Sequence, residues 1–209
     1  MKALVAAVLL GACAFEPGSS SVGDDASVLP IFPDAPPGES LLTQTSSNAV
    51  VTGDSVYCQG KTGTVDNAWY RAFAPPQPFH LDYALFATEA TLADDATVIV
   101  YSYTGELDGP TLDLTKMGQL ATFAVASTTD ATPQGFGTTV DMDLAGPFVI
   151  CVVSTDAVTT SGQVTAYFHL GANEAGESAP SYWASHACQQ DVPIAVSADL
   201  LIAADGKTS

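Results

Sequence analysis

The sequence predicts an all-β fold, an antiparallel jelly-roll-like β-sandwich of about eight or nine strands that follows a signal peptide and a flexible linker. Short runs of β-branched and aromatic residues recur along residues 48–209, and turn signals rich in Gly, Pro and Asp separate them. No segment there has the apolar periodicity of a convincing amphipathic helix. We therefore expect one β domain over 48–209.

The first four expected strands lie in the amino-terminal half of this domain. Residues 50–58 are the first run, and 68–73 form the aromatic run AWYRAF. Residues 79–89 follow a proline-rich turn. Residues 97–103 (TVIVYSY) alternate apolar and polar side chains with the period of two that is typical of a half-buried strand.

The other four expected strands lie closer to the carboxyl terminus. Residues 120–126, 138–144 and 164–170 are bounded by turns that contain Gly, Pro or Asp. Residues 148–154 begin with the uninterrupted apolar run FVICVV, which predicts a central strand. A single helical turn is expected at 112–117.

The amino terminus has the pattern of a secretory signal. Lys2 precedes ten apolar or small residues, a run too short to span a bilayer, which takes about 20 residues. Its end, LGAC at 10–13, resembles the lipobox of bacterial lipoproteins. The resemblance implies lipidation of the Cys13 sulfur and cleavage that leaves residues 1–12 as the signal peptide; Ala14 favours the outer membrane. The alternative is an ordinary cleavable signal.

Residues 13–47 differ in composition from the β domain expected after them. The stretch after the cysteine is rich in Pro, Gly, Ser and acids and has no basic residue, which favours an extended linker. The apolar run VLPIF at 28–32 interrupts this pattern. It either docks on the domain or on a partner, or is an incidental cluster.

Motifs near both ends of the domain resemble a known family. The opening motifs are SVYC at 55–58 and DNAWYRAF at 66–73, and the closing motifs are NEAGESAPSY at 173–182 and AC at 187–188. They resemble an uncharacterised β-sandwich domain of bacterial secreted and surface proteins, and more remotely the pre-peptidase C-terminal domains of exported hydrolases. The chain departs from the family at 83–89 and lacks a glycine after Cys188. The resemblance implies the fold, and no common catalytic activity is attached to it.

Three of the four cysteines remain once Cys13 is lipidated, an odd number for an oxidising compartment. If Cys58 and Cys188 flank the two ends of the family-like domain, a disulfide between them would tie the ends together. Cys151, inside the most apolar run, then remains as a buried thiol. The absence of a close C-x-x-C pair argues against zinc.

The chain is strongly acidic, with 23 acidic and five basic residues and a formal net charge of −18. Such a surface repels nucleic acid and anionic lipids, so the lipid anchor is the expected membrane attachment. The acids are either a solvated exported surface or a cation site. No cofactor is expected apart from a candidate structural calcium, for which the candidate ligands are Asp94, Asp95, Asp141 and Asp143.

No catalytic motif is present. The sequence lacks a nucleophile elbow, a zinc-protease His pair and a phosphate-binding glycine loop, and its three histidines are expected to be structural. Trp183 and Tyr182 are the candidate ligand-binding aromatics. We expect a non-enzymatic envelope protein whose sandwich is a binding or structural module for an unnamed protein or glycan. The alternatives are a hydrolase of unrecognised type or a carbohydrate-binding accessory domain.

Overall fold

The computed structural model describes residues 32, 40–76, 78–126 and 132–208. Its regular elements are β-strands and one 3-10 turn, η1 (Leu114–Lys116), which confirms the all-β fold class and the helical turn expected nearby. The signal peptide and Cys13 lie outside the described residues. The strands are β1 (Ser40–Leu42), β2 (Gly63–Phe73), β3 (Phe79–Leu92), β4 (Ala96–Tyr103), β5 (Met117–Val125), β6 (Gln134–Leu144), β7 (Phe148–Val158), β8 (Val164–Leu170), β9 (Ala172–Asn173), β10 (Ser181–Ser185), β11 (Gln190–Val196), β12 (Asp199–Leu200) and β13 (Ile202–Thr208).

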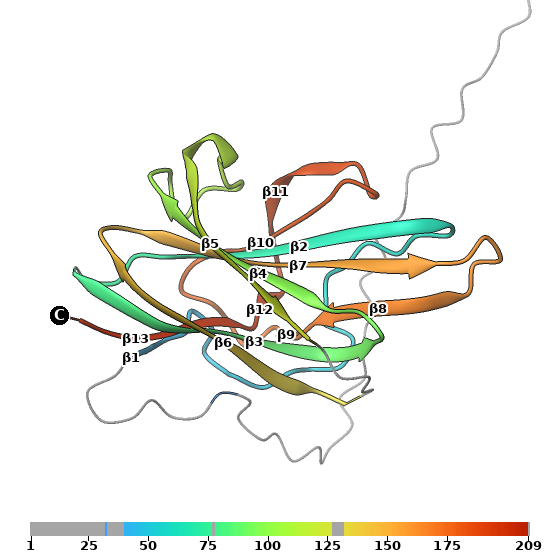
Figure 1. Ribbon diagram of the computed structural model, residues 1–209, viewed down its shortest axis with the longest axis horizontal. Helices are drawn as coiled ribbons and strands as arrows, with labels where there is room; N and C mark the ends of the chain where they lie inside the picture. Colours follow the sequence, from blue (N-terminus) through green and yellow to red (C-terminus); the bar gives the residue numbers. More distant parts are fainter. Residues whose placement is uncertain (1–31, 33–39, 77, 127–131, 209) are drawn as a thin grey trace, which may run out of the picture.

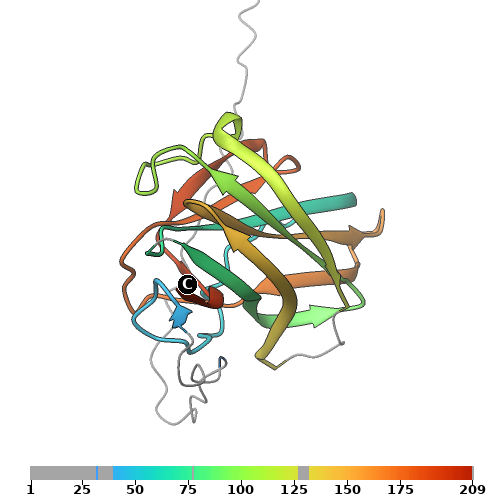
Figure 2. The same ribbon diagram turned by 60° about the vertical axis from the view of Figure 1, so that its left-hand side comes forward.

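The strands are antiparallel and form two packed layers (Figures 1 and 2). One layer has the order β5-β4-β7-β2-β10-β11, and the other has β1-β13-β3-β6. At one end of the sandwich, β8 pairs with both β3 and β7, so hydrogen bonding continues from one layer into the other. Strands β9 and β12 form a separate two-stranded sheet.

Strand β7 is the centre of its layer, as the uninterrupted apolar run predicts. It pairs with β2 on one side and β4 on the other, and its first five residues are buried. Strand β4 shows the expected alternation of buried and half-buried residues. The core between the layers is aromatic, and Phe148 stacks with both Phe73 and Phe79 at centroid distances of 5.2 and 6.1 Å.

The prediction of a strand at 50–58 is wrong, because this segment is irregular in the structure. It crosses the end of the sandwich and is held by side chains: the Trp69 indole N–H donates to the Val56 carbonyl, and the Cys58 backbone N–H donates to Asn67 Oδ1. These bonds, with that from the Val51 N–H to the Ala172 carbonyl, hold the segment in place without a strand ladder.

Part of the segment expected as linker contacts the sandwich. Strand β1 pairs with β13 through Ser40 to Leu42, although it lies within 13–47. Phe32 is only 4% exposed and packs with Ala87, Leu201 and Ala203. Phe32, the last residue of the apolar run at 28–32, therefore docks on the domain, one of the outcomes that the sequence left open, whereas 28–31 lie outside the described residues.

The disulfide expected from the family resemblance is present. Cys58 and Cys188 are bonded, with their Cα atoms 5.8 Å apart and a sequence separation of 130, while Cys151 is free and buried. The opening and closing motifs also meet directly, because β2 pairs with β10 in a register that places Arg71 opposite Ser181. The two ends of the domain thus lie together.

Candidate functional site

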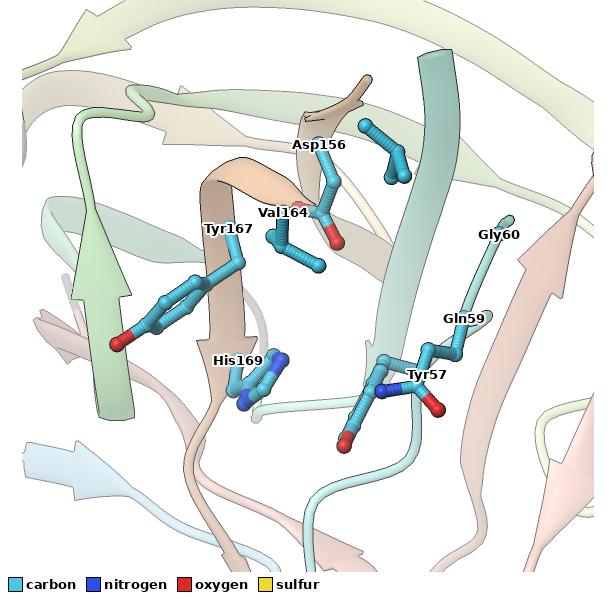
Figure 3. A pocket seen from close by; sticks show the side chains of 8 residues that line it. Tyr57, Gln59, Gly60, Asp156, Val164, Tyr167 and His169 are labelled. Atoms are coloured by element: carbon cyan, nitrogen blue, oxygen red, sulfur yellow. The ribbon is translucent and has the colours of Figure 1, made fainter. Parts of the chain in front are cut away.

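A cavity opens where the segment before β2 passes the β7–β8 hairpin (Figure 3). Its volume is about 230 Å³. Strand β8 supplies one wall because its side chains alternate: Ala166, Phe168 and Leu170 are buried, whereas the side chains between them face the cavity. The cavity is lined by Tyr57, Gln59, Gly60, Asp156, Val158, Val164, Tyr167 and His169, and we call it the Tyr57–His169 pocket.

Three aromatic rings stand side by side along this pocket. The rings of Tyr57 and His169 stack with their centroids 3.8 Å apart and an interplanar angle of 16°. Tyr167 lies on the other side of His169 at 5.0 Å and 30°, as Figure 3 shows. Burial lowers the pKa of His169 even though the negative charge of Glu89 opposes the shift, so the imidazole is neutral at pH 7.

Four side chains of the pocket have open hydrogen-bonding capacity. The hydroxyls of Tyr57 and Tyr167, the amide of Gln59 and the ring nitrogens of His169 bond to no other residue that the structure describes. Each is uncharged, and together they offer both donors and acceptors. A polar ligand would find partners here that the protein leaves unused.

A pair of carboxyl groups lies at the inner wall of the pocket. Asp156 is 5% exposed, and its Oδ1 accepts the Phe168 backbone N–H at 3.0 Å. Its carboxyl hydrogen-bonds that of Asp94, and the Ser154 hydroxyl donates to Asp94 Oδ2 at 2.7 Å. Burial, followed by the charge of Asp94, raises the pKa of Asp156 to about 7, although the Phe168 N–H opposes the shift. One shared proton therefore holds the pair together.

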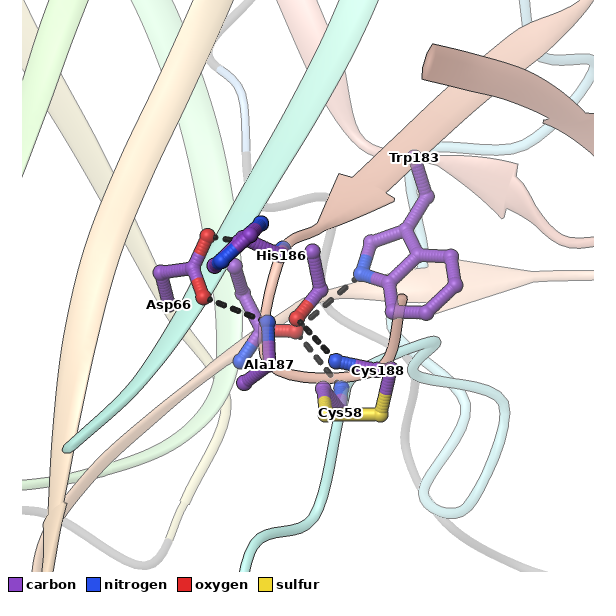
Figure 4. Close-up of a disulfide and its surroundings, with 8 residues drawn as sticks. Cys58, Asp66, Trp183, His186, Ala187 and Cys188 are labelled. Carbon is purple, nitrogen blue, oxygen red and sulfur yellow. Dashed lines mark hydrogen bonds between the residues drawn. A yellow bond between two sulfur atoms is a disulfide. The ribbon is translucent and has the colours of Figure 1, made fainter. Parts of the chain in front are cut away.

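The candidate ligand aromatics of the sequence lie elsewhere and point into the protein. Tyr182 is fully buried, and its hydroxyl donates to the carbonyls of Leu107 and Gly109 at 3.1 and 2.9 Å. Trp183 is half-buried beside the disulfide, and its indole N–H donates to Asn67 Oδ1 at 3.1 Å (Figure 4). The polar atoms of both side chains are therefore used in hydrogen bonds within the fold.

The candidate calcium ligands are not brought together. Asp94 joins Asp156, whereas Asp141 and Asp143 belong to β6 and contact His80, with distances of 3.1 Å to Nε2 and 2.8 Å to Nδ1. Asp95 is exposed in the turn between β3 and β4. Within the described ranges, no group of three or more His, Cys, Asp or Glu side chains is arranged to hold a metal ion.

The other two histidines are held by carboxylates. The hydrogen bond that the His80 imidazole donates to Asp143 raises the pKa of His80, and the one that His186 donates to Asp191, at 2.6 Å, raises the pKa of His186. His186 lies on the surface beside the disulfide, in a turn whose backbone N–H groups donate to Asp66 (Figure 4). No hydroxyl or thiol of the described chain hydrogen-bonds any of the three imidazoles.

The closing motif has a structural role in this fold. Arg71 is fully buried, and its guanidinium donates to Glu177 Oε2 at 2.5 Å and to Ser181 Oγ at 2.7 Å. The Leu200 backbone N–H also donates to Ser181 Oγ. Burial lowers the pKa of Arg71 to about 10 although Glu177 opposes it, and burial raises the pKa of Glu177. This ion pair fixes β10 against β2 and the β12 segment.

Sequence reasoning did not select Tyr57, Tyr167, His169 or Asp156 as site residues. Two signals could have pointed to them. Tyr167 and His169 are separated by one residue on an alternating strand and so share a face, and Asp156 follows the continuously apolar run at 148–153. The contribution of Tyr57 depends on the irregular path of 50–58, which the strand expectation concealed.

Comparisons with known proteins found a structural similarity but no match in sequence. No protein-family model matches the chain, and no curated protein sequence matches it. A solved structure of similar shape covers the cysteine protease and lectin-like domains of Cwp84, a surface layer associated protein of Clostridium difficile. The TM-score is 0.46 at 14% identity, and the match spans 82% of this chain and 36% of that one. Within the described residues, no helix has the length and apolar character needed to cross a bilayer.

Proposed function

We propose that this chain is a non-enzymatic, lipid-anchored protein of the bacterial cell envelope, whose β-sandwich binds a ligand in the Tyr57–His169 pocket. The observation that carries the proposal is the set of four neutral side chains in the pocket whose hydrogen-bonding capacity no described residue uses. Pockets that combine apolar walls with a few convergent polar groups are the usual form of a ligand site.

Export is supported by the chemistry of the cysteines. The disulfide between Cys58 and Cys188 is of the kind that persists in oxidising compartments outside the cytoplasm. The lipobox-like LGAC sequence supplies the anchor at Cys13, and the acidic surface would not bind anionic headgroups by itself. In this proposal the outer membrane holds the lipid, and the sandwich is displayed on the linker.

A binding role is favoured over catalysis by the geometry of the polar groups. A nucleophilic mechanism needs a hydroxyl or thiol within hydrogen-bond reach of a base, and the described imidazoles have no such neighbour. Glycoside hydrolysis uses two carboxyls about 5 Å apart or farther. Asp94 and Asp156 hydrogen-bond each other directly, which leaves no room for a sugar between them.

One observation favours a hydrolase as the second candidate. The pKa of Asp156, at about 7, suits a general acid near neutral pH, and the carboxyl lies at the pocket. Turnover of a panel of esters, glycosides and peptides that is lost in both Asp156→Asn and His169→Phe would establish this role and displace the binding proposal.

The proposal is tested with the exported chain carrying Cys13→Ser, which keeps the whole domain and its linker in solution. We expect it to bind an immobilised envelope polysaccharide or protein fraction, and His169→Phe to reduce that binding. Tyr83→Phe is the matched control, because Tyr83 is 43% exposed and does not line the pocket. Binding that is identical in the His169 variant would show that the pocket is not the ligand site.

A further inference from the structure

We propose that the Tyr57–His169 pocket takes a single neutral, hydroxyl-rich ring, of the size of one monosaccharide or cyclic polyol. This inference rests on the binding role proposed above and specifies its ligand. It is argued from the chemistry of the open groups, the charge around them and the size of the cavity.

The open groups suit hydroxyls better than any other polar group. Two phenol hydroxyls, a carboxamide and a neutral imidazole each combine donor and acceptor atoms, or can offer either. A sugar hydroxyl is likewise both donor and acceptor, so it can satisfy any of the four. An anion needs donors alone, and a cation needs acceptors alone, so either would leave part of this set unused.

The charge around the pocket disfavours anionic ligands. No Lys or Arg lines it, and the negative charges of Glu89 and Asp156 add to burial in raising the pKa of Tyr57. Burial is the larger cause of that shift, and the two acidic groups add a negative potential at the Tyr57 hydroxyl. A carboxylate or phosphate would enter against this potential and would find no countercharge in the pocket lining.

Two features also disfavour cationic ligands. The Asp156 carboxyl already accepts the Phe168 N–H and hydrogen-bonds Ser154 and Asp94, so its hydrogen-bonding capacity is largely engaged within the protein. A cation binds an aromatic ring over its face, but the facing surfaces of the Tyr57 and His169 rings cover each other at 3.8 Å.

The size of the cavity limits the ligand to one ring. Drug-sized ligands occupy pockets of roughly 300–1,000 Å³, and this one measures about 230 Å³. Val158 and Val164 add apolar surface to the lining. A ring with hydroxyls at its edge and C–H groups on its faces matches both the polar and the apolar parts of the lining.

The test is a two-dimensional ¹H–¹⁵N NMR titration of the exported chain carrying Cys13→Ser. The probes are glucose, N-acetylglucosamine and myo-inositol as neutral rings, with glucuronate and glucosamine as anionic and cationic rings of the same shape. We expect neutral probes to shift amides of residues 57–60 and 164–169 in the millimolar range. Glucuronate and glucosamine should bind about tenfold more weakly or not at all.

Two variants locate the contacts. His169→Phe keeps a ring between the two tyrosines but removes both nitrogens, and Tyr167→Phe removes one hydroxyl. Each should weaken binding of the neutral probe by up to about tenfold, the value of one lost hydrogen bond, while Tyr83→Phe should leave it unchanged. Unfolding midpoints equal to that of the parent chain would show that the variants still fold.

The outcomes separate this inference from the function on which it rests. If only a charged ring shifts the pocket amides, or if no probe does, the neutral-ring assignment is overturned. The binding role then still stands wherever envelope binding depends on His169. If His169→Phe leaves envelope binding unchanged, the proposed function itself is refuted.

Discussion

Replacing Asp156 by Asn should make the protein more stable at neutral pH, and the gain should grow with pH. The carboxyl has a pKa of about 7 in the folded protein against 3.8 for an ordinary aspartate, because burial and the charge of Asp94 disfavour its ionised form. The unfolded chain releases this proton as pH rises past 3.8, whereas the folded chain keeps it up to about 7. Folding stability therefore falls across this interval and levels off above it.

The size of the effect follows from the shift. About three pH units at about 1.4 kcal/mol each correspond to an upper limit of about 4 kcal/mol between pH 4 and pH 8. Asn has the same shape as the protonated acid, so its amide can donate to Asp94 while its oxygen accepts the Phe168 N–H. The variant should keep the contacts of the wild type, and its folding free energy should not include the pH-dependent loss that comes from keeping Asp156 protonated.

The measurement is the free energy of urea unfolding of wild type and Asp156→Asn at pH 4, 6 and 8, followed by the fluorescence of the buried Trp69. The two proteins should differ little at pH 4, and the variant should be more stable by about 2–4 kcal/mol at pH 8. Glu106→Gln, an exposed acid beyond the opposite end of β4, controls for the loss of one negative charge. A difference between variant and wild type that is constant with pH would refute the shared-proton account.

Four further predictions concern the disulfide, the Arg71–Glu177 ion pair, the docking of Phe32 and the lipid anchor at Cys13. Cys58→Ser should lower the free energy of unfolding by about 2–5 kcal/mol, whereas Cys151→Ala should leave the bridge intact in non-reducing peptide maps. Arg71→Met should cost about 3–5 kcal/mol because Glu177 stays buried without its partner, and Arg71→Met with Glu177→Leu should recover most of this in the same urea assay. Phe32→Ala should cost about 3 kcal/mol and should move the first site of limited proteolysis toward Ser40; an unchanged cleavage map would show that Phe32 does not hold its segment. Cys13→Ser should release the protein from the membrane, and detergent-phase partitioning equal to that of wild type would rule out the lipid anchor.

The strands that the sequence predicts are those whose own residue pattern is typical of a strand. Strands β4 and β7 have β-branched, aromatic and apolar residues in patterns that only a half-buried or a central strand satisfies. Strand β13 has the sequence IAADGKT, whose residues favour turns, and it forms because it pairs with β3 and β1 and buries Ala203 and Ala204. Its strand conformation comes from long-range pairing, which residue patterns do not encode.

The contact between Tyr57 and His169 was beyond prediction for a related reason. Tyr57 and His169 are 112 positions apart by their numbering, and their contact depends on how an irregular segment crosses the end of β8. Trp183 and Tyr182 were selected because tryptophan and tyrosine often bind ligands, yet the fold uses their polar atoms internally. Residue type indicated candidates, and only the arrangement decided which polar atoms remain open.

The irregular path of 50–58 is what makes the pocket possible. A paired strand there would bind its backbone N–H and C=O groups to a neighbouring strand, and that pairing would fix where Tyr57 and Gln59 lie. Instead, the disulfide fixes Cys58 between them, and the Cys58 N–H donates to Asn67 at 2.6 Å. With Cys58 fixed between them, Tyr57 stacks on His169 and Gln59 lines the cavity. The segment that carries Cys58 of the disulfide therefore also forms one wall of the pocket. Loss of the disulfide would disturb the site as well as the stability of the fold.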